Sequence, residues 1–338
     1  MPATNVSWPT PLMRLNPWYP GQMGVPGTDS EEGLRLDTEG TIYWVDPNHV
    51  DNNDGRDGTN PTAPLATVAA ALTHCEAYRG DVIAVMHNGG WTYGNPLSAH
   101  VTPIQEAVTI DVHGVRLVGV SSSVLGVPWI PTANNDVLIS VDALDVIIEG
   151  FCFWDSGYTG VTAIATDWDG VTSWGENTTI RHCYFYDVAY GVTLDYSWND
   201  VIEDCQFFAM ATAAIHNPSV NGEPDYLVIR DCIFRDNTAD INLPDCDEVL
   251  VEGCRFMDVT AAVAILAGDN NQIFNNTIQG NPAGVNNYIN LTAGLNNLVS
   301  RNSLACSIAQ YDTTCSDAGS GSWGGNECSN GPTTAPPV

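Results

Sequence analysis

Short stretches of alternating hydrophobic and polar residues, separated by turn-forming residues, run along most of the chain, and this pattern is typical of β-strands. Residues 41–46 (TIYWVD) are predicted to form one strand and residues 80–86 (GDVIAVM) a second, buried one. Between them, residues 65–78 (LATVAAALTHCEAY) have the spacing of an amphipathic helix. The pattern therefore predicts an all-β protein with a helix near the beginning of the chain.

From about residue 110 onward, similar segments recur, and they align without gaps. The aligned segments share a reference position, which is held by Val120, Phe151, Cys183, Cys205, Cys232, Cys254, Asn276 and Asn302. The residue three positions before it is always aliphatic, and Phe stands two positions after it in the segments from Phe153 to Phe256. The residue directly before it is Gly, His, Asp or Asn in all segments except the last, which has Arg301.

The spacing of these columns indicates how each repeat folds. Inward positions of one strand are an even number of residues apart, whereas the aliphatic and reference columns are three apart. A residue with a left-handed backbone between them restores both to the inside, and Gly, Asn and Asp tolerate that conformation best. Each repeat is therefore predicted to be strand, bend, strand. A third strand is expected at residues 191–196, 213–217, 240–244, 262–266 and 288–292.

Stacking of these repeats explains two further columns. Two positions before the reference, the charge alternates through Glu149, Arg181, Glu203, Arg230 and Glu252, which predicts an outward ladder of ion pairs that opposes register slips. The reference cysteines are flanked by Ile and Phe, so we interpret them as small buried core thiols. A zinc or redox site is the alternative.

The columns resemble the right-handed parallel β-helix of the pectate-lyase superfamily. Asn276 and Asn302 look like the inward Asn ladder of that fold, and the DNNDGRDGTNP loop followed by PLATVAAAL looks like its opening loop and capping helix. The resemblance implies an all-β chain of three-strand coils over residues 41–305, with a capping helix at 65–78. An extended Pro-rich and aromatic arm is expected at 1–40, and an irregular tail at 306–338.

Aromatic residues outside the repeat are the candidate interface residues. In the arm they accompany closely spaced prolines, so we expect an extended arm that contacts a neighbouring subunit; a disordered tail is the alternative. A second group of aromatic residues, with Tyr196, falls in the loops of adjacent coils. This group suggests an exposed patch that serves as a sugar platform or a protein interface; the alternative is that these residues pack on their own loops. The candidates are Trp8, Trp18, Tyr19, Trp168, Trp174 and Trp198.

Charge excludes several classes of partner. The chain has 40 acidic residues against 10 basic ones, every basic residue is Arg, and the formal net charge is −30. We therefore expect no binding to nucleic acid or to a membrane. The first residues lack the features of a signal peptide, so we expect synthesis in the host cytoplasm with reduced cysteines. The exception to reduced cysteines is the tail, where one disulfide could form among Cys306, Cys315 and Cys328.

The motifs that the superfamily's enzymes carry are missing. The resemblance implies an Arg or Lys base beside acidic Ca²⁺ ligands for lyases, paired Asp residues in NTD, DD and GHG motifs for hydrolases, and a DPHD-type motif for epimerases. None is found, so no catalytic residue and no cofactor are assigned. The Asp51–Asp57 loop could hold Ca²⁺ but lacks a closing Glu, and a plain loop is the alternative. Four acidic residues recur at the same turn of successive repeats: Asp155, Asp187, Asp236 and Asp258. We interpret them as residues that start the turn, and a track of cation ligands is the alternative.

These features together favour a non-enzymatic structural protein of a virion, such as a head decoration or cement protein of a tailed phage. Its expected partners are capsid or other virion proteins, with copies of itself as a further partner. The alternative is a polysaccharide-active enzyme or a glycan-binding tail protein of the same fold, for which a glycan would be the partner.

Overall fold

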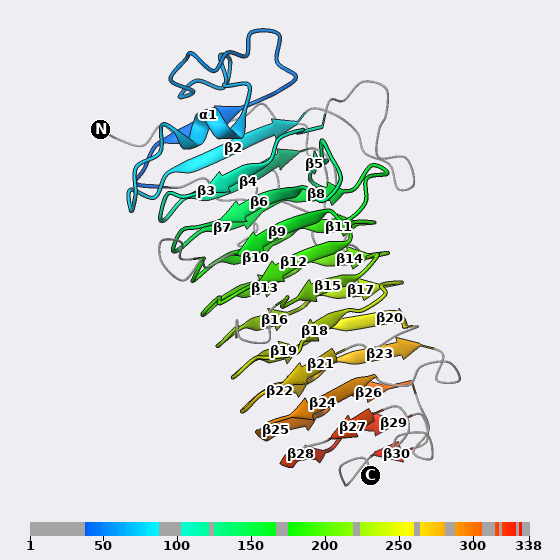
Figure 1. Cartoon of the computed structure of the whole chain (residues 1–338). Coiled ribbons are helices and arrows are strands. Elements are labelled where there is room, and N and C mark those ends of the chain that lie inside the picture. Colours follow the sequence, from blue (N-terminus) through cyan, green and yellow to red (C-terminus); the bar gives the residue numbers. More distant parts are fainter. Residues whose placement is uncertain are drawn as a thin grey trace, which may run out of the picture.

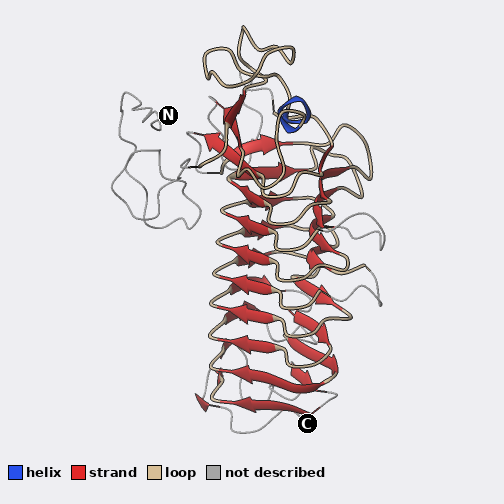
Figure 2. Ribbon diagram, turned by 90° about the vertical axis from the view of Figure 1, so that its left-hand side faces the viewer, coloured by secondary structure: helices blue, strands red, loops and turns tan. Residues whose placement is uncertain are grey.

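Short strands wind into coils that stack along one axis (Figures 1 and 2). The computed structural model describes residues 38–87, 103–121, 125–166, 175–218, 224–259, 264–280, 288–305, 315–317, 320–328 and 331–332. In this part of the chain the strands form three sheets, in which neighbouring strands are parallel except for the pair β29 and β30. The predicted right-handed parallel β-helix is confirmed.

Each sheet collects one strand from each successive coil. The first sheet contains β1 (Ile42–Val45), β2 (Val82–His87), β4 (Arg116–Ser121), β7 (Ile147–Glu149), β10 (Thr179–Arg181), β13 (Val201–Glu203), β16 (Val228–Arg230), β19 (Leu250–Glu252), β22 (Gln272–Phe274), β25 (Leu295–Ser300) and β28 (Ser320–Gly324). The second contains β5 (Val127–Trp129), β8 (Phe151–Trp154), β11 (Tyr184–Tyr186), β14 (Gln206–Phe208), β17 (Ile233–Arg235), β20 (Arg255–Val259), β23 (Thr277–Gly280), β26 (Ser303–Leu304), β29 (Glu327–Cys328) and β30 (Gly331–Pro332). The third contains β3 (Val108–Ile110), β6 (Val137–Val141), β9 (Thr162–Thr166), β12 (Tyr190–Leu194), β15 (Ala213–His216), β18 (Ile241–Leu243), β21 (Ala264–Ala267), β24 (Ile289–Ala293) and β27 (Cys315–Asp317).

Residues with a left-handed backbone mark the corners between the sheets. At corner 2, between the first and second sheets, φ is positive at Gly150, His182, Asp204, Asp231, Gly253, Asn275, Arg301 and Gly325, which confirms the predicted bend. At corner 1, which precedes the strands of the first sheet, φ is likewise positive at Gly114, Asp145, Asn177, Asn199, Tyr226, Glu248, Asn270 and Asn296. The sequence analysis did not identify corner 1, because no regular hydrophobic column precedes it.

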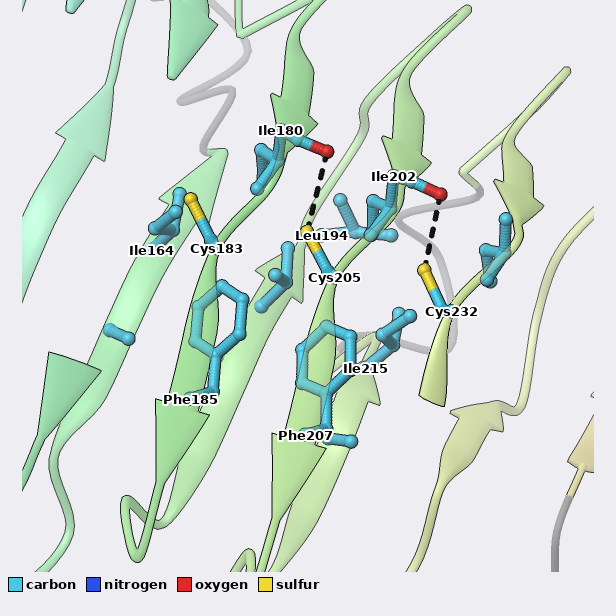
Figure 3. Packing of buried hydrophobic residues seen from close by; sticks show 14 of the residues in the cluster. Ile164, Ile180, Cys183, Phe185, Leu194, Ile202, Cys205, Phe207, Ile215 and Cys232 are labelled. Carbon is cyan, nitrogen blue, oxygen red and sulfur yellow. Dashed lines mark hydrogen bonds between the residues drawn. The ribbon is translucent and has the colours of Figure 1, made fainter. Parts of the chain in front are cut away.

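The core is a set of stacked inward columns (Figure 3). The reference cysteines are buried and unpaired, as predicted, and each contacts a backbone carbonyl of the preceding coil; they are Cys183, Cys205, Cys232 and Cys254. The Phe column beside them is a continuous ring stack, with centroids 4.5 Å apart between Phe185 and Phe207 and 5.0 Å apart between Phe207 and Phe234. Burial of these rings supplies a large apolar contribution to stability.

The Asn ladder is confirmed and is longer than expected. Asn302 accepts the backbone N–H of Asn276 at 3.0 Å and donates from its amide to the carbonyl of Ile273 at 3.0 Å. Asn326 repeats the arrangement one coil further, since its Oδ1 accepts the backbone N–H of Asn302 at 2.9 Å. These buried amides satisfy the backbone groups that the bend at corner 2 leaves without strand partners.

The described residues between 315 and 328 continue the solenoid, so for this part of the chain the expectation of an irregular tail is wrong. Strands β27, β28 and β29 pair in parallel with β24, β25 and β26 of the preceding coil. In this coil Trp323 replaces the aliphatic residue and Cys328 replaces Phe, which hid the repeat in the sequence. Cys315 and Cys328 are buried in the core. Because Cys306 lies outside the described residues, the disulfide stays a prediction.

The N-terminal end differs from the expectation in two details. Helix α1 spans only Val68–Leu72. It begins late because Leu65 already forms a bridge with Val45 and Thr67 caps the first turn by accepting the Ala70 N–H at 3.1 Å, and it ends early at the C-cap residue Thr73. Gly119, expected at a bend, lies inside the straight strand β4, which pairs with β2 along its length.

The predicted arm falls almost entirely outside the described part of the chain. Of residues 1–40, only 38–40 are described, and the Thr38 hydroxyl donates to the Gly80 carbonyl at the beginning of the stack.

Candidate functional site

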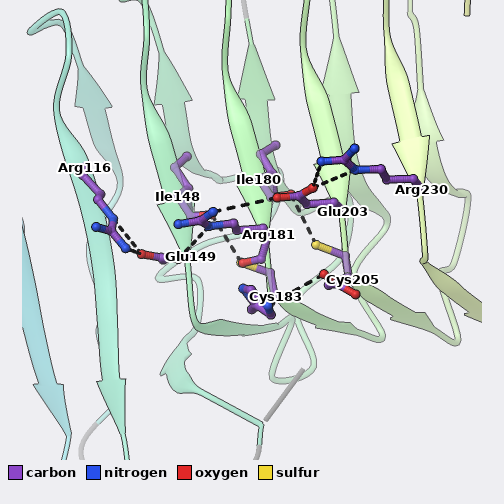
Figure 4. A network of polar contacts seen from close by, with 11 residues as sticks. Arg116, Ile148, Glu149, Ile180, Arg181, Cys183, Glu203, Cys205 and Arg230 are labelled. Carbon is purple, nitrogen blue, oxygen red and sulfur yellow. Dashed lines mark hydrogen bonds and ion pairs between the residues drawn. The ribbon is translucent and has the colours of Figure 1, made fainter. Parts of the chain in front are cut away.

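The outer face of the first sheet carries the predicted row of alternating charges (Figure 4). Arg181 lies between Glu149 at 2.7 Å and Glu203 at 3.9 Å, and Arg230 pairs with Glu203 at 2.5 Å. Arg116 adds a member that the sequence analysis missed, since its Nε donates to Glu149 at 2.7 Å. The ladder therefore engages arginines that could otherwise have served as a catalytic base.

Glu149 departs from the expectation that the whole ladder points into solvent. Its side chain is only 3% exposed, because Arg116 and Arg181 cover it from the two neighbouring coils. The Arg230 side chain, by contrast, is 50% exposed. A buried carboxylate between guanidinium groups is costly to leave unpaired, so this end of the ladder fixes the register more firmly than the exposed end.

A second polar pair lies at corner 2, beside the ladder. His182 Nε2 is 3.8 Å from Asp204 Oδ2, and both side chains are partly exposed. Burial raises the pKa of Asp204, and the neighbouring His182 opposes this shift. Within the described ranges, no three His, Cys, Asp or Glu residues are placed to hold a metal ion.

The outer face of the third sheet carries neutral hydrogen-bonding and ring groups. The Tyr190 ring stacks on His216 in the next coil with centroids 5.1 Å apart, and Thr193 is the strand partner of His216. Asn242 follows in the coil after that. Burial lowers the pKa of His216, so its imidazole is neutral at neutral pH and can accept a proton. The sequence analysis missed this group, because outward positions of the third strand follow no column.

Only one of the predicted interface residues can be placed. Trp8, Trp18, Tyr19, Trp168 and Trp174 lie outside the described residues.

Trp198 lies at corner 1, is 49% exposed, and forms a bridge with Asp225 of the next coil. Tyr226, which the sequence analysis did not consider, follows directly and is 52% exposed. The tertiary structure therefore places an exposed aromatic residue at corner 1 in each of two adjacent coils.

The oxygen-rich loop at 51–57 uses its side chains to hold its own backbone. Asp54 Oδ1 accepts the N–H groups of Ala66 and Thr67 at 2.7 and 3.0 Å, and Asp57 Oδ1 accepts the Thr59 N–H at 3.1 Å. These contacts favour the plain-loop interpretation over a Ca²⁺ site.

The recurring acids at corner 3, between the second and third sheets, have similar structural roles. Asp155 accepts the Gly157 N–H at 2.8 Å, and Asp187 and Asp236 have a left-handed backbone. Burial raises the pKa of Asp155 and of Asp187. The turn-forming interpretation is supported at these three positions.

Comparison with known proteins agrees with this geometry. Residues 146–313 match the family model of the right handed beta helix region. This chain is a right-handed parallel β-helix protein. The fold that the resemblance implied is therefore confirmed. No curated protein sequence matches the chain.

Solved structures share the architecture of this β-helix protein at low sequence identity. An alginate lyase from Paenibacillus sp. str. FPU-7 superposes with a TM-score of 0.60 and 14% identity, covering 80% of this chain and 95% of that one. ORF18 of Geobacillus virus E2 gives 0.47 and 11% identity over 85% of this chain and 62% of that chain. The tailspike protein of E. coli bacteriophage HK620, in complex with pentasaccharide, gives 0.45 and 13% identity over 91% and 65%. The first of these likenesses shows the fold alone. No helix in the described part of the chain is long and apolar enough to cross a membrane.

Proposed function

We propose that this β-helix protein is a non-enzymatic structural component of a virion surface, such as a head decoration or cement protein, that binds neighbouring subunits. The observation that carries the proposal is the use of charge on the first sheet. Arg116, Arg181 and Arg230 contact Glu149 and Glu203 in a ladder that holds the coils in register. Acids at the corners and in the opening loop likewise bind backbone N–H groups. A rod built this way is a rigid, acidic scaffold.

Two assays test this proposal together. The purified chain is incubated with neutral and acidic polysaccharides, and reducing ends and the ultraviolet absorbance of unsaturated products are followed; we expect no product. In parallel, residues 1–37 are deleted, while Thr38 is kept because it contacts Gly80. The shortened chain should fold, as judged by circular dichroism, but should no longer join particles. Cleavage of a polysaccharide, or normal incorporation without the arm, would contradict the proposal.

A polysaccharide-active enzyme is the second candidate, and the outer face of the third sheet favours it. A neutral His216 could accept a proton while the Tyr190 hydroxyl donates one, and the two rings are in contact. The fold shared with an alginate lyase is compatible with this candidate. If the chain does release product, His216→Ala and Tyr190→Phe should each abolish it, whereas Tyr78→Ala, an exposed aromatic residue near the other end, should not.

A further inference from the structure

Corner 1 presents an apolar strip to solvent. Trp198 and Tyr226 are about half exposed in adjacent coils. The outward column of the first sheet begins just after them and is aliphatic, with Val201, Val228 and Leu250 paired in consecutive coils and partly exposed. We call these five residues the Trp198 surface. Exposed aromatic residues beside aliphatic ones are typical of a surface that another protein covers.

Carboxylates border this surface along the solenoid axis. Asp225, Asp247 and Asp269 stand three residues before the first-sheet strand in three successive coils. Asp247 Oδ1 accepts the Asp269 N–H at 2.5 Å, and Asp269 Oδ1 accepts the Leu295 N–H at 2.6 Å, so the column is fixed by the backbone. Burial, and then repulsion from Asp247, raises the pKa of Asp225. A cation placed beside Asp225 and Asp247 would relieve this repulsion.

We infer that the Trp198 surface docks a basic segment of a partner protein, whose Arg or Lys side chains contact Trp198, Tyr226 and the neighbouring carboxylates. Apolar side chains of the same segment cover the aliphatic column. The inference rests on the proposed subunit-binding function and names the chemistry of the partner.

Charge and the exposed aliphatic side chains both favour a basic protein segment over a glycan as the occupant. A chain with net charge −30 attracts a basic segment over long range. Cations bind favourably over aromatic rings, and Arg235 makes such a contact within this molecule, 5.4 Å from the Phe208 ring centroid. A sugar can stack on a Trp ring, but it gains little from Val201, Val228 and Leu250, which a protein segment can bury.

The first test measures binding of a fluorescein-labelled peptide of alternating Arg and Leu residues to the full chain by anisotropy at physiological salt. We expect Trp198→Ala combined with Tyr226→Ala to weaken binding about tenfold. The control, Tyr78→Ala, removes an aromatic residue that is 64% exposed elsewhere. It should change the affinity less than about twofold. Both variants keep the net charge. Equal affinity for the double variant and the control would overturn the inference.

A second pair of variants separates local recognition from general attraction to an acidic protein. Asp247→Asn with Asp269→Asn removes two charges at the surface but keeps the Oδ1 acceptors, whereas Asp51→Asn with Asp57→Asn removes two exposed charges from the opening loop. Only the first pair should weaken binding and flatten its salt dependence. If both pairs act alike, the attraction is non-specific and the inference fails.

Glycan binding and particle assembly give distinct outcomes. If the aromatic double variant loses binding to dextran or cello-oligosaccharides but keeps the peptide, the surface is a sugar platform and the inference is wrong. If deletion of residues 1–37 prevents particle incorporation while the peptide binds wild type and double variant equally, this inference fails and the proposed function stands. If the chain cleaves polysaccharide, the proposed function fails irrespective of peptide binding.

Discussion

Beyond the first coils, two successive parts of the solenoid, a thiol half and an amide half, fill the same inward position in different ways. From Cys183 to Cys254 the position holds a thiol, whose contacts to carbonyls of the preceding coil are long, such as 3.6 Å from Cys205 to Ile180. From Asn276 to Asn326 it holds an amide, which makes hydrogen bonds of about 3 Å to neighbouring coils. The thiol half also carries the stacked Phe column, whereas the amide half has smaller residues there. The comparison indicates that apolar packing holds one half and hydrogen bonds hold the other.

The largest expected effect comes from breaking the aromatic stack. Phe207→Ala removes a ring that contacts Phe185 and Phe234 and that is 1% exposed. The lost burial and the cavity should lower the free energy of unfolding by about 3–5 kcal/mol. Urea melts followed by circular dichroism measure it. A neutral result would show that packing does not hold the thiol half.

The next largest effect is expected in the amide half, at the reference position that Cys205 holds in the thiol half. Asn302→Leu leaves the Asn276 N–H and the Ile273 carbonyl without their partner inside the core. We expect a loss of about 3 kcal/mol, since each orphaned buried group costs about 1–3 kcal/mol. The matched control is Cys205→Ala, which should cost only about 1 kcal/mol. If the two substitutions cost the same, the distinction between the halves is wrong.

Asp200 offers a test that depends on pH. Asp200 occupies a second inward column together with Asn271 and Asn297. Its Oδ1 accepts the Thr178 N–H at 2.7 Å, and the Oδ1 atoms of Asn271 and Asn297 likewise accept N–H groups of the preceding coil. Burial raises the pKa of Asp200 from 3.8 to about 8. Between these values the folded chain holds a proton that the unfolded chain has lost, so stability falls as pH rises from about 4 to about 8.

Asp200→Asn should therefore stabilise the protein at pH 8 by more than about 1 kcal/mol and change little at pH 4. Thermal melts at the two pH values measure this. The control is Asp57→Asn on the exposed loop, which should not alter the pH dependence. Stabilisation by Asp200→Asn that is the same at both pH values would contradict protonation of this acid.

The smallest expected effect concerns Glu203, which lies toward the exposed end of the outer ladder. Glu203→Arg places three like charges in a row with Arg181 and Arg230. We expect a loss of about 1 kcal/mol or less that shrinks as salt is added. Melts at low and high salt measure it. A large loss that salt does not change would mean that this part of the ladder contributes as a buried network.

Much of the fold could be predicted, because the repeat imposes the same requirement on every coil. The bend at corner 2 was predicted from residue types that tolerate a left-handed backbone. The buried Cys column was predicted from its recurrence at one inward position between Ile and Phe, and the Asn ladder was implied by the resemblance to the pectate-lyase superfamily. The last coil was missed, since Trp323 and Cys328 break the hydrophobic pattern while its pairing with β25 and β26 is preserved. Helix α1 was overestimated, because the pairing of Leu65 with Val45 competes with its first turn.

The sequence by itself determined the local conformations and the inward columns, because bends and hydrophobic periodicity depend on residues a few positions apart. Only the tertiary structure decided which outward side chains meet. Glu149 is buried because arginines of both neighbouring coils cover it. Trp198 and Tyr226 lie at the same corner of adjacent coils because parallel pairing aligns corner 1 of successive coils. Such contacts depend on the stacking register and on loop lengths, which no single repeat specifies.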